Sequence, residues 1–186
     1  TVYQYPDTVL HSVKRSHITP EYIELKTFKE KVKAICIGLI LYQNLTDAFT
    51  EELKSENGIV QPDIDRDILP IANVGRHGQS DIGSGFVKGF GMKHGAFAES
   101  VAHDTHNIIV VGTNYNDMAE AVNHVIDMQG GLALVKDGQV IGDLPLRIGG
   151  LMTDEMSAGE LTKRMDELTG LAGSELGCKA HAPFMH

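Results

Sequence analysis

The chain has 186 residues, of which 42% are hydrophobic and 22% charged, so it can form one compact domain with a buried core and is short for two. Twenty glycines and six prolines argue against a helical bundle. The formal net charge of −9 argues against nucleic acid as a partner, because phosphate binding requires a basic surface, and it suits a small neutral or cationic ligand better.

The two cysteines, Cys36 and Cys178, are far apart and form no CxxC pair, so we expect free thiols and neither a disulfide framework nor a cysteine zinc site. No apolar run approaches the roughly 20 residues that span a bilayer, and the first residues do not resemble a signal peptide. We therefore expect a soluble, cytoplasmic protein with no membrane partner. The missing initial Met indicates a piece of a longer chain.

The first predicted elements are short or ambiguous. Thr19 followed by Pro20 is a helix-start signal and predicts one or two helical turns. Residues 31–42 predict a strand whose continuously apolar end should be buried on both faces. Residues 46–58 fit either a strand or a short helix, and they end at a turn signal, Asn57-Gly58.

The middle of the chain predicts more strands. Residues 67–76 form one, with Pro70 suggesting an edge strand or a bulge. Residues 96–102 and 108–111 predict two partner strands, and the intervening "HDTHN" predicts the loop that connects them, because Asp, Thr and Asn favour turns.

The last third gives the strongest signals. Residues 116–128 predict a helix that Asn114 or Asn116 caps and Gly130 ends. Its apolar residues recur at helical spacing on one stripe, comprising Met118, Ala121, Val122, Val125 and Ile126.

A hairpin over residues 131–142 follows, with Asp137-Gly138 as its type I′ turn. Ser157 and Glu160 form a capping box that begins a second helix. Several strands with only two good helices predict an α+β fold, a mainly antiparallel sheet with two principal helices packed on it, in a single domain over residues 1–186. A doubly wound sheet, the alternative, needs more regular alternation of strands and helices.

The segment "ESVAHDTHN" places His103, Asp104 and His106 directly before a buried strand. A short loop between core strands holds side chains in fixed directions, which suits a site. These residues have the chemistry of metal ligands, of hydrogen-bonding partners for a heterocyclic base, and of a general acid and base near neutral pH. Because HxxH supplies only two ligands, a metal site needs others, and an ordinary polar turn is the competing interpretation.

The glycine-rich stretch over residues 75–95 fits neither the dinucleotide fingerprint nor a P-loop. Its glycines suit close approach to a ligand, or bulges in a twisted sheet. Arg76 and His77 end the preceding strand, and we expect them to pair with Asp81.

The segments "GFVKGFG" and "VAHDTHNIIVVGTN", and most of the chain from about Val13 to Phe184, closely resemble the C-terminal domain of bacterial adenine deaminase, a member of the amidohydrolase superfamily. The positions that match the family pattern are Arg76, His77, Gly83, Lys88, Gly89, Gly91, Ser100, His103, Asp104, His106 and Asn107. Thr105 stands where the family usually has Ser, and Glu99 and the "NVG" before Arg76 depart from the pattern.

The resemblance implies that a metal-dependent barrel precedes this domain and that adenine is hydrolysed to hypoxanthine and ammonia in purine salvage. A divalent metal, manganese or iron, is then expected in the barrel, where it lowers the pKa of bound water, and no metal or other cofactor is expected in this chain. The resemblance also implies adenine, the barrel and further copies of the enzyme as partners, and an isolated domain that is inactive.

We expect the "HDTHN" loop to lean over the mouth of the barrel and help close it on adenine. The residues expected to bind substrate or close the loop are His103, Asp104, His106, Asn107 and Ser100, and those expected to support them are Arg76, His77 and Lys88. No residue is assigned with certainty to catalysis. Two alternatives stay open, namely a structural or oligomerisation domain without catalytic contacts, and an independent hydrolase with a metal at His103 and His106.

Overall fold

The computed structural model describes residues 3–40, 45–103 and 105–184. Two helices are substantial, α2 (Tyr115–Asp127) and α3 (Ala158–Ser174), and two are short, α1 (Asp7–Leu10) and the 3-10 turn η1 (Pro20–Tyr22). The strands are β1 (Lys31–Leu39), β2 (Thr46–Glu56), β3 (Ile59–Val60), β4 (Leu69–Val74), β5 (Ile82–Lys88), β6 (Ala96–Glu99), β7 (Ile108–Gly112), β8 (Gly131–Lys136) and β9 (Gln139–Pro145).

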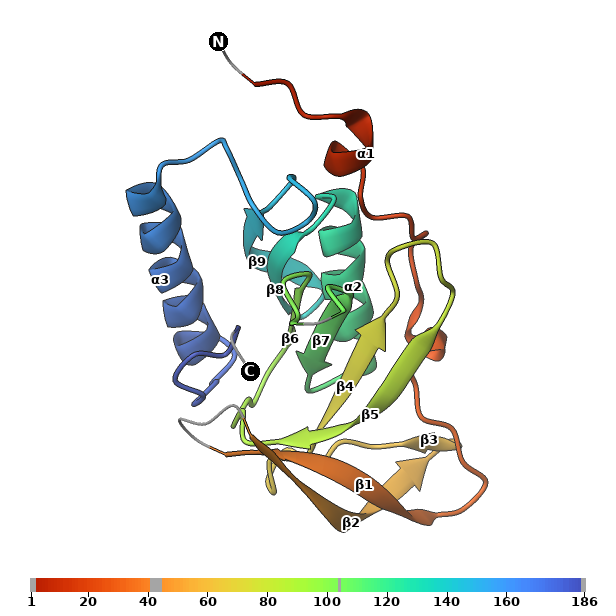
Figure 1. The fold of residues 1–186 in the computed structure, drawn as a ribbon. Helices are drawn as coiled ribbons and strands as arrows, with labels where there is room; N and C mark the ends of the chain where they lie inside the picture. The colour runs from red at the N-terminus through yellow and green to blue at the C-terminus, as the bar shows by residue number, and fades with distance from the viewer. Residues whose placement is uncertain (1–2, 41–44, 104, 185–186) are drawn as a thin grey trace.

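These strands form one nine-stranded sheet in the order β3-β2-β1-β5-β4-β7-β6-β8-β9 (Figure 1). Every neighbouring pair is antiparallel except β1 and β5. The predicted α+β class is therefore confirmed.

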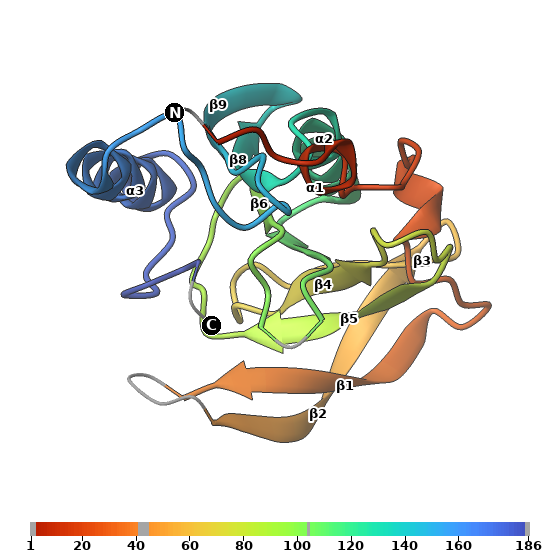
Figure 2. The same ribbon diagram turned by 45° about the horizontal axis from the view of Figure 1, so that its top comes forward.

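The two large helices cover opposite faces of the sheet, and Figure 2 looks nearly along both with β6 and β8 between them. Side chains alternate across a strand, so Ala96 and Ala98 of β6 pack with α2, whereas Phe97 packs with α3. Contacts of α3 with the sheet are made chiefly at β9, the far edge. On this face, α3 therefore leaves the part of the sheet near β4, β5 and β1 without a covering helix.

The helix α2 forms as predicted, because local signals specify it. Asn114 caps the helix by accepting a hydrogen bond from the Asp117 amide at 2.8 Å, and Gly130 follows its end with φ +113°. Its entire predicted apolar stripe is buried: Met118, Ala121, Val122, Val125 and Ile126.

The capping box of Ser157 and Glu160 is formed at the start of α3. The hairpin of β8 and β9 turns at Asp137 and Gly138, both with positive φ as a type I′ turn requires. Both features confirm the sequence prediction, because capping and turn chemistry act over only a few residues.

The predicted helical turn at Pro20 is present as η1, and the ambiguous segment over 46–58 is the long strand β2 followed by a turn at Asn57 and Gly58. Residues 41–42 of the strand predicted over 31–42 lie outside the described residues. The described apolar end of β1 is not buried on both faces, so the prediction is wrong there. Ile35 is 75% exposed and Ile37 is 43% exposed, because no helix covers their side of the sheet.

Pro70 lies in β4, which is an interior strand with a regular register, so neither the predicted edge strand nor the alternative, a bulge, is present. The proline is tolerated because the β4–β7 ladder begins only at Ile71. The glycine-rich turn after β5 is held by Asp67, whose carboxylate accepts hydrogen bonds from the amides of Gly89 (2.9 Å) and Gly91 (2.7 Å).

Both cysteines are free thiols, as expected, with Cys36 buried and Cys178 half-buried. Across the described ranges, we find no helix that combines the length and apolar character needed to span a membrane.

Candidate ligand-binding site

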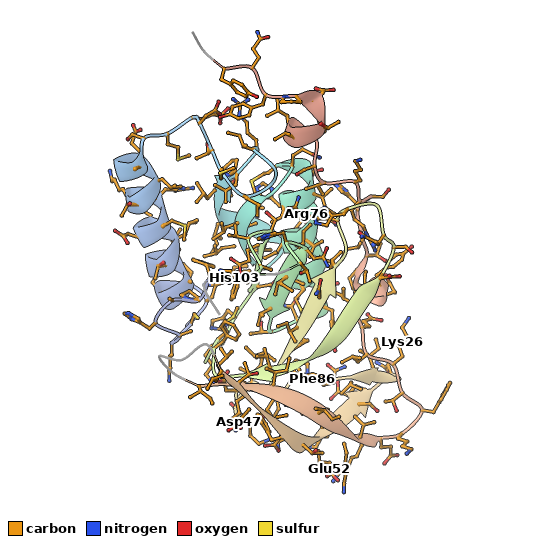
Figure 3. All side chains as sticks on the ribbon, in the orientation of Figure 1. Lys26, Asp47, Glu52, Arg76, Phe86 and His103 are labelled. Atoms are coloured by element: carbon orange, nitrogen blue, oxygen red, sulfur yellow. The ribbon has the colours of Figure 1, made fainter. Side chains whose placement is uncertain are left out.

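The predicted loop connects β6 to β7 over residues 100–107, and these two strands pair antiparallel. The loop turns tightly: the His106 amide donates to the Ala102 carbonyl at 2.9 Å, and His106 has φ +49°. His103 and Thr105 are exposed, and His103 lies between α3 and β4 in the view of Figure 3. Asp104 lies outside the described residues.

Arg76 holds this loop from behind. Arg76 is 1% exposed, and its guanidinium donates through Nε to the His106 carbonyl, through Nη1 to Ser12 Oγ at 2.9 Å and through Nη2 to the Gly149 carbonyl at 2.9 Å. No described carboxylate forms an ion pair with it, so the predicted pairing of Arg76 with Asp81 is wrong. Burial lowers the pKa of Arg76 from its ordinary value.

Other predicted residues support the loop without lining a cavity. Ser100 is fully buried, and its hydroxyl donates to the Gly150 carbonyl at 2.5 Å and accepts from the Gly131 amide at 2.8 Å. His77 is exposed, and its Nε2 lies 3.3 Å from the Thr105 carbonyl oxygen.

Lys88 lies elsewhere. Its Nζ is 5.6 Å from the centre of the Phe49 ring, and alternation along β5 points it away from the face of Val87. The loop therefore has buried anchors, but the structure does not bring Lys88 to it.

A large cavity of about 520 Å³ opens beside the loop, on the face of the sheet that α3 leaves uncovered. His103 and Thr105 line it from the loop. Its walls are mostly apolar, with Leu39, Ile71, Val87, Phe90, Ile109 and Phe184 among them. Its volume is within the roughly 300–1,000 Å³ typical of small-molecule sites.

Two polar side chains of the sheet also face the large cavity, Glu99 of β6 and Asn73 of β4. Both residues pair with Ile109 of the intervening β7, so the three side chains form one row on one face. Glu99 is 5% exposed, and its carboxyl makes no hydrogen bond to another described residue. Burial raises the pKa of Glu99 to about 8.

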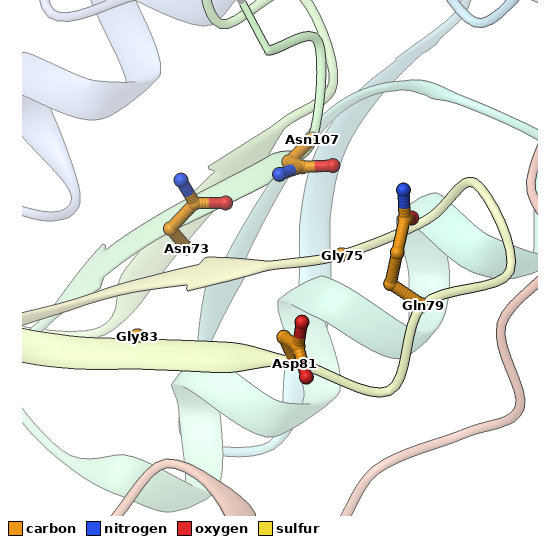
Figure 4. Close-up of a pocket in the computed structure, with 6 residues that line it drawn as sticks. All are labelled: Asn73, Gly75, Gln79, Asp81, Gly83 and Asn107. Carbon is orange, nitrogen blue, oxygen red and sulfur yellow. The ribbon is translucent and has the colours of Figure 1, made fainter.

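Asn73 also borders a small cavity of about 290 Å³, shown in Figure 4. Asn107, another predicted site residue, lines this small cavity, and its amide end turns toward that of Asn73. Asn73 Oδ1 is fully buried without a hydrogen-bond partner in the described part of the chain, and the same holds for His106 Nδ1. Asn73 is therefore a lining residue of both the small and the large cavity.

Sequence reasoning missed Glu99 and Asn73 as site residues. A signal was present for Glu99, an ionisable residue among Ala96, Phe97 and Ala98 in a strand that otherwise reads as apolar. Asn73 similarly interrupts the apolar residues of β4. Neither belongs to a recognised motif.

Within residues 3–40, 45–103 and 105–184, no group of three or more His, Cys, Asp or Glu side chains is placed to hold a metal ion. The described side chains therefore do not fit a resident divalent metal.

An α+β domain with a buttressed polar loop beside an apolar cavity is the class that the fold and the site define. The chain belongs to the family described as the adenine deaminase C-terminal domain, whose profile matches residues 43–186.

Named relatives agree with this assignment. A protein called adenine deaminase 1 from Carboxydothermus hydrogenoformans is 54% identical over 185 residues, which cover 99% of this chain and 31% of that protein. Adenine deaminases from Clostridium botulinum (40% identical) and Methanococcoides burtonii (35% identical) each match 98% of this chain, which covers 31% and 32% of their respective lengths. The chain thus spans about a third of the length of these relatives.

Proposed function

We propose that this chain is the C-terminal part of an adenine deaminase, which hydrolyses adenine to hypoxanthine and ammonia. In that reaction the bond from C6 to the amino nitrogen breaks, a bond from C6 to a water oxygen forms, and ammonia leaves. The family membership and the names of relatives that match nearly the whole chain support the reaction.

The role proposed for this domain is to place the loop over residues 100–107 against the site where adenine reacts. The supporting observation is the buttress behind the loop: Arg76 binds the carbonyl of His106 from a fully buried position, while His103 stays exposed beside the large cavity. A loop held in this way can exclude water and orient a base, and little conformational entropy is lost on binding because the loop is already ordered.

In this proposal the divalent metal, manganese or iron, is bound by polypeptide that precedes this chain in the longer enzyme. When bound, it supplies an activated water. The residues of this chain bind, orient and shield the base.

The face around the large cavity is suited to contact with that preceding polypeptide. Ile35 and Ile37 of β1 expose apolar side chains, and Ile37 also lines the cavity. About two thirds of the length of the relatives lies outside the region that this chain matches, which is ample to cover such a surface. Contact with a second copy of the enzyme is the alternative, in which the domain serves assembly alone.

The test is steady-state deamination of adenine by the full-length enzyme with His103→Ala or Asp104→Ala. We expect each change to lower kcat/KM by roughly tenfold or more, as loss of a group that binds or transfers protons does. His17→Ala is the matched control, because His17 is an exposed histidine whose ring contacts Asp127 of α2, on the other face of the sheet.

An unchanged kcat/KM in both loop variants would reject the catalytic role of the loop and favour the assembly role. Measuring the mass of the enzyme in solution for each variant shows whether assembly has changed instead.

A further inference from the structure

Glu99 is buried, and no hydrogen bond to its carboxyl is formed by another described residue. Asn73 is half-buried, but its Oδ1 is fully buried without a partner in the described part of the chain. Both side chains line the large cavity, and we call them the cavity pair. We propose that the cavity pair binds an uncharged, planar nitrogen heterocycle of the purine-base class, laid over Ile109. The choice of purine bases rests on the proposed function, whereas the cavity and its polar groups are observed in the structure independently of that function.

The register of the sheet sets the spacing of the cavity pair. Asn73 and Glu99 both pair with Ile109 and lie on the two strands that flank β7. Strands are about 4.8 Å apart, so their Cα atoms are about 10 Å apart, and both side chains rise from the same face. A flat ring that lies on the aliphatic side chain of Ile109 is then within reach of a polar group at each end.

The surroundings keep Glu99 uncharged. Its strand neighbours are Ile109 on β7 and Leu132 on β8, both apolar. Of the described residues that line the cavity, only His103 is titratable besides Glu99, and it comes from the exposed loop. Because burial raises the pKa of Glu99 to about 8, the carboxyl is mostly protonated at neutral pH.

A protonated carboxyl donates one hydrogen bond and accepts another, and the Asn73 carbonyl oxygen accepts. The matching ligand offers an N–H group to Asn73 and a ring nitrogen to Glu99. It carries no net charge, because an anion would lie in an apolar cavity without a cation, and it is flat enough to pack against Phe90 and Phe184. Purine bases have these features.

The experiment is calorimetric titration of the 186-residue chain with adenine and with hypoxanthine. We expect at least one base to bind to the wild-type chain. Glu99→Leu and Asn73→Ala should each weaken binding by about tenfold or more, because each leaves a polar atom of the base unpaired. Glu99→Gln, which keeps a neutral donor and acceptor, should retain affinity within about threefold at pH 7. Glu120→Leu, at an exposed glutamate of α2, is the matched control.

The pH dependence separates a neutral from an ionised Glu99. Wild-type affinity should fall about tenfold from pH 7 to pH 9, since the ionised carboxylate cannot donate, and Glu99→Gln should not share this fall. The Gln variant thereby corrects for ionisation of the base itself. Thermal melts establish that each variant is folded. We expect Glu99→Leu to fold, because the carboxyl that it removes forms no hydrogen bond to another described residue.

The proposal is overturned if neither base binds, if Glu99→Leu binds as tightly as the wild type, or if affinity rises with pH. These outcomes are independent of the deaminase assay. Binding that depends on the cavity pair in an enzyme that does not deaminate adenine would reject the proposed function and leave this inference standing. If His103→Ala lowers deamination but neither base binds to the cavity pair, the proposed function stands and this inference is rejected.

Discussion

Two pairs of polar side chains lie in or beside the loop at residues 100–107, and they differ in their hydrogen bonding. Both members of the anchor pair, Arg76 and Ser100, form hydrogen bonds, to Ser12, His106, Gly131, Gly149 and Gly150. In the cavity pair, Glu99 is buried and Asn73 is half-buried with a fully buried Oδ1, yet neither the Glu99 carboxyl nor Asn73 Oδ1 has a partner in the described ranges.

Burial alone therefore does not separate structural from functional polar groups in this domain. Most buried polar atoms in proteins have a partner, and those without one raise the free energy of the folded state. The anchor pair stabilises the loop, whereas the cavity pair costs stability that a bound ligand can recover. Removing members of the two pairs should consequently change stability in opposite directions.

The largest effect is expected for Arg76→Met. The carbonyls of His106 and Gly149 and the hydroxyl of Ser12 would lose their donor, and we expect the free energy of unfolding to fall by about 4 kcal/mol in denaturant titration. Arg147→Met is the control, because the pair of Arg147 with Asp154 is partly exposed and should contribute less than about 1 kcal/mol. Equal effects in both variants would contradict the anchoring role.

Glu99→Gln should stabilise the protein in a pH-dependent way. The pKa of Glu99 is raised from 4.5 to about 8 on folding, so between these values the folded state holds a proton that the unfolded state has lost. Wild-type stability should therefore decrease as pH rises from about 5 to 8, by about 3 kcal/mol relative to Glu99→Gln, and level off above that.

Denaturant titration of both proteins at pH 5, 6, 7 and 8 measures this difference. Glu120→Gln, at an exposed site, should keep the pH profile of the wild type. Parallel profiles for wild type and Glu99→Gln would show that Glu99 is not held neutral in the cavity.

A smaller effect is expected for Ser100→Ala. The Gly150 carbonyl and the Gly131 amide would each lose a buried partner, which should lower the free energy of unfolding by about 2 kcal/mol. Ser16→Ala, at an exposed serine, should change it by less than about 0.5 kcal/mol. If Ser100→Ala raised the free energy of unfolding, the hydrogen bonds of Ser100 would not stabilise the fold, which would contradict the difference between the two pairs.

The parts of the fold that sequence predicts here are those specified locally. The stripe of α2, the Ser157 capping box and the Asp137-Gly138 turn all depend on residues a few positions apart. Errors arose where distant segments decide the outcome. Ile35 is exposed because α3 lies over β9 and not over β1, and Pro70 sits in an interior strand because the ladder to β7 begins one residue later.

The same distinction holds for the site. The sequence predicts the loop and His103 within it, because residues that favour turns stand between two apolar runs. Glu99 and Asn73 each interrupt an apolar strand, but their pairing could not be predicted, because they are brought together only through their shared neighbour Ile109 and sheet register is not readable from a single sequence. The anchoring of His106 by Arg76 also depends on tertiary contact.

Carbon-13 NMR of the Glu99 side-chain carboxyl tests the account most directly. At pH 7 we predict the signal of a protonated acid that titrates near pH 8 and moves when adenine is added. An ionised carboxylate at pH 7, or a signal that saturating adenine leaves unmoved, would contradict the claim that Glu99 is a neutral ligand-binding group.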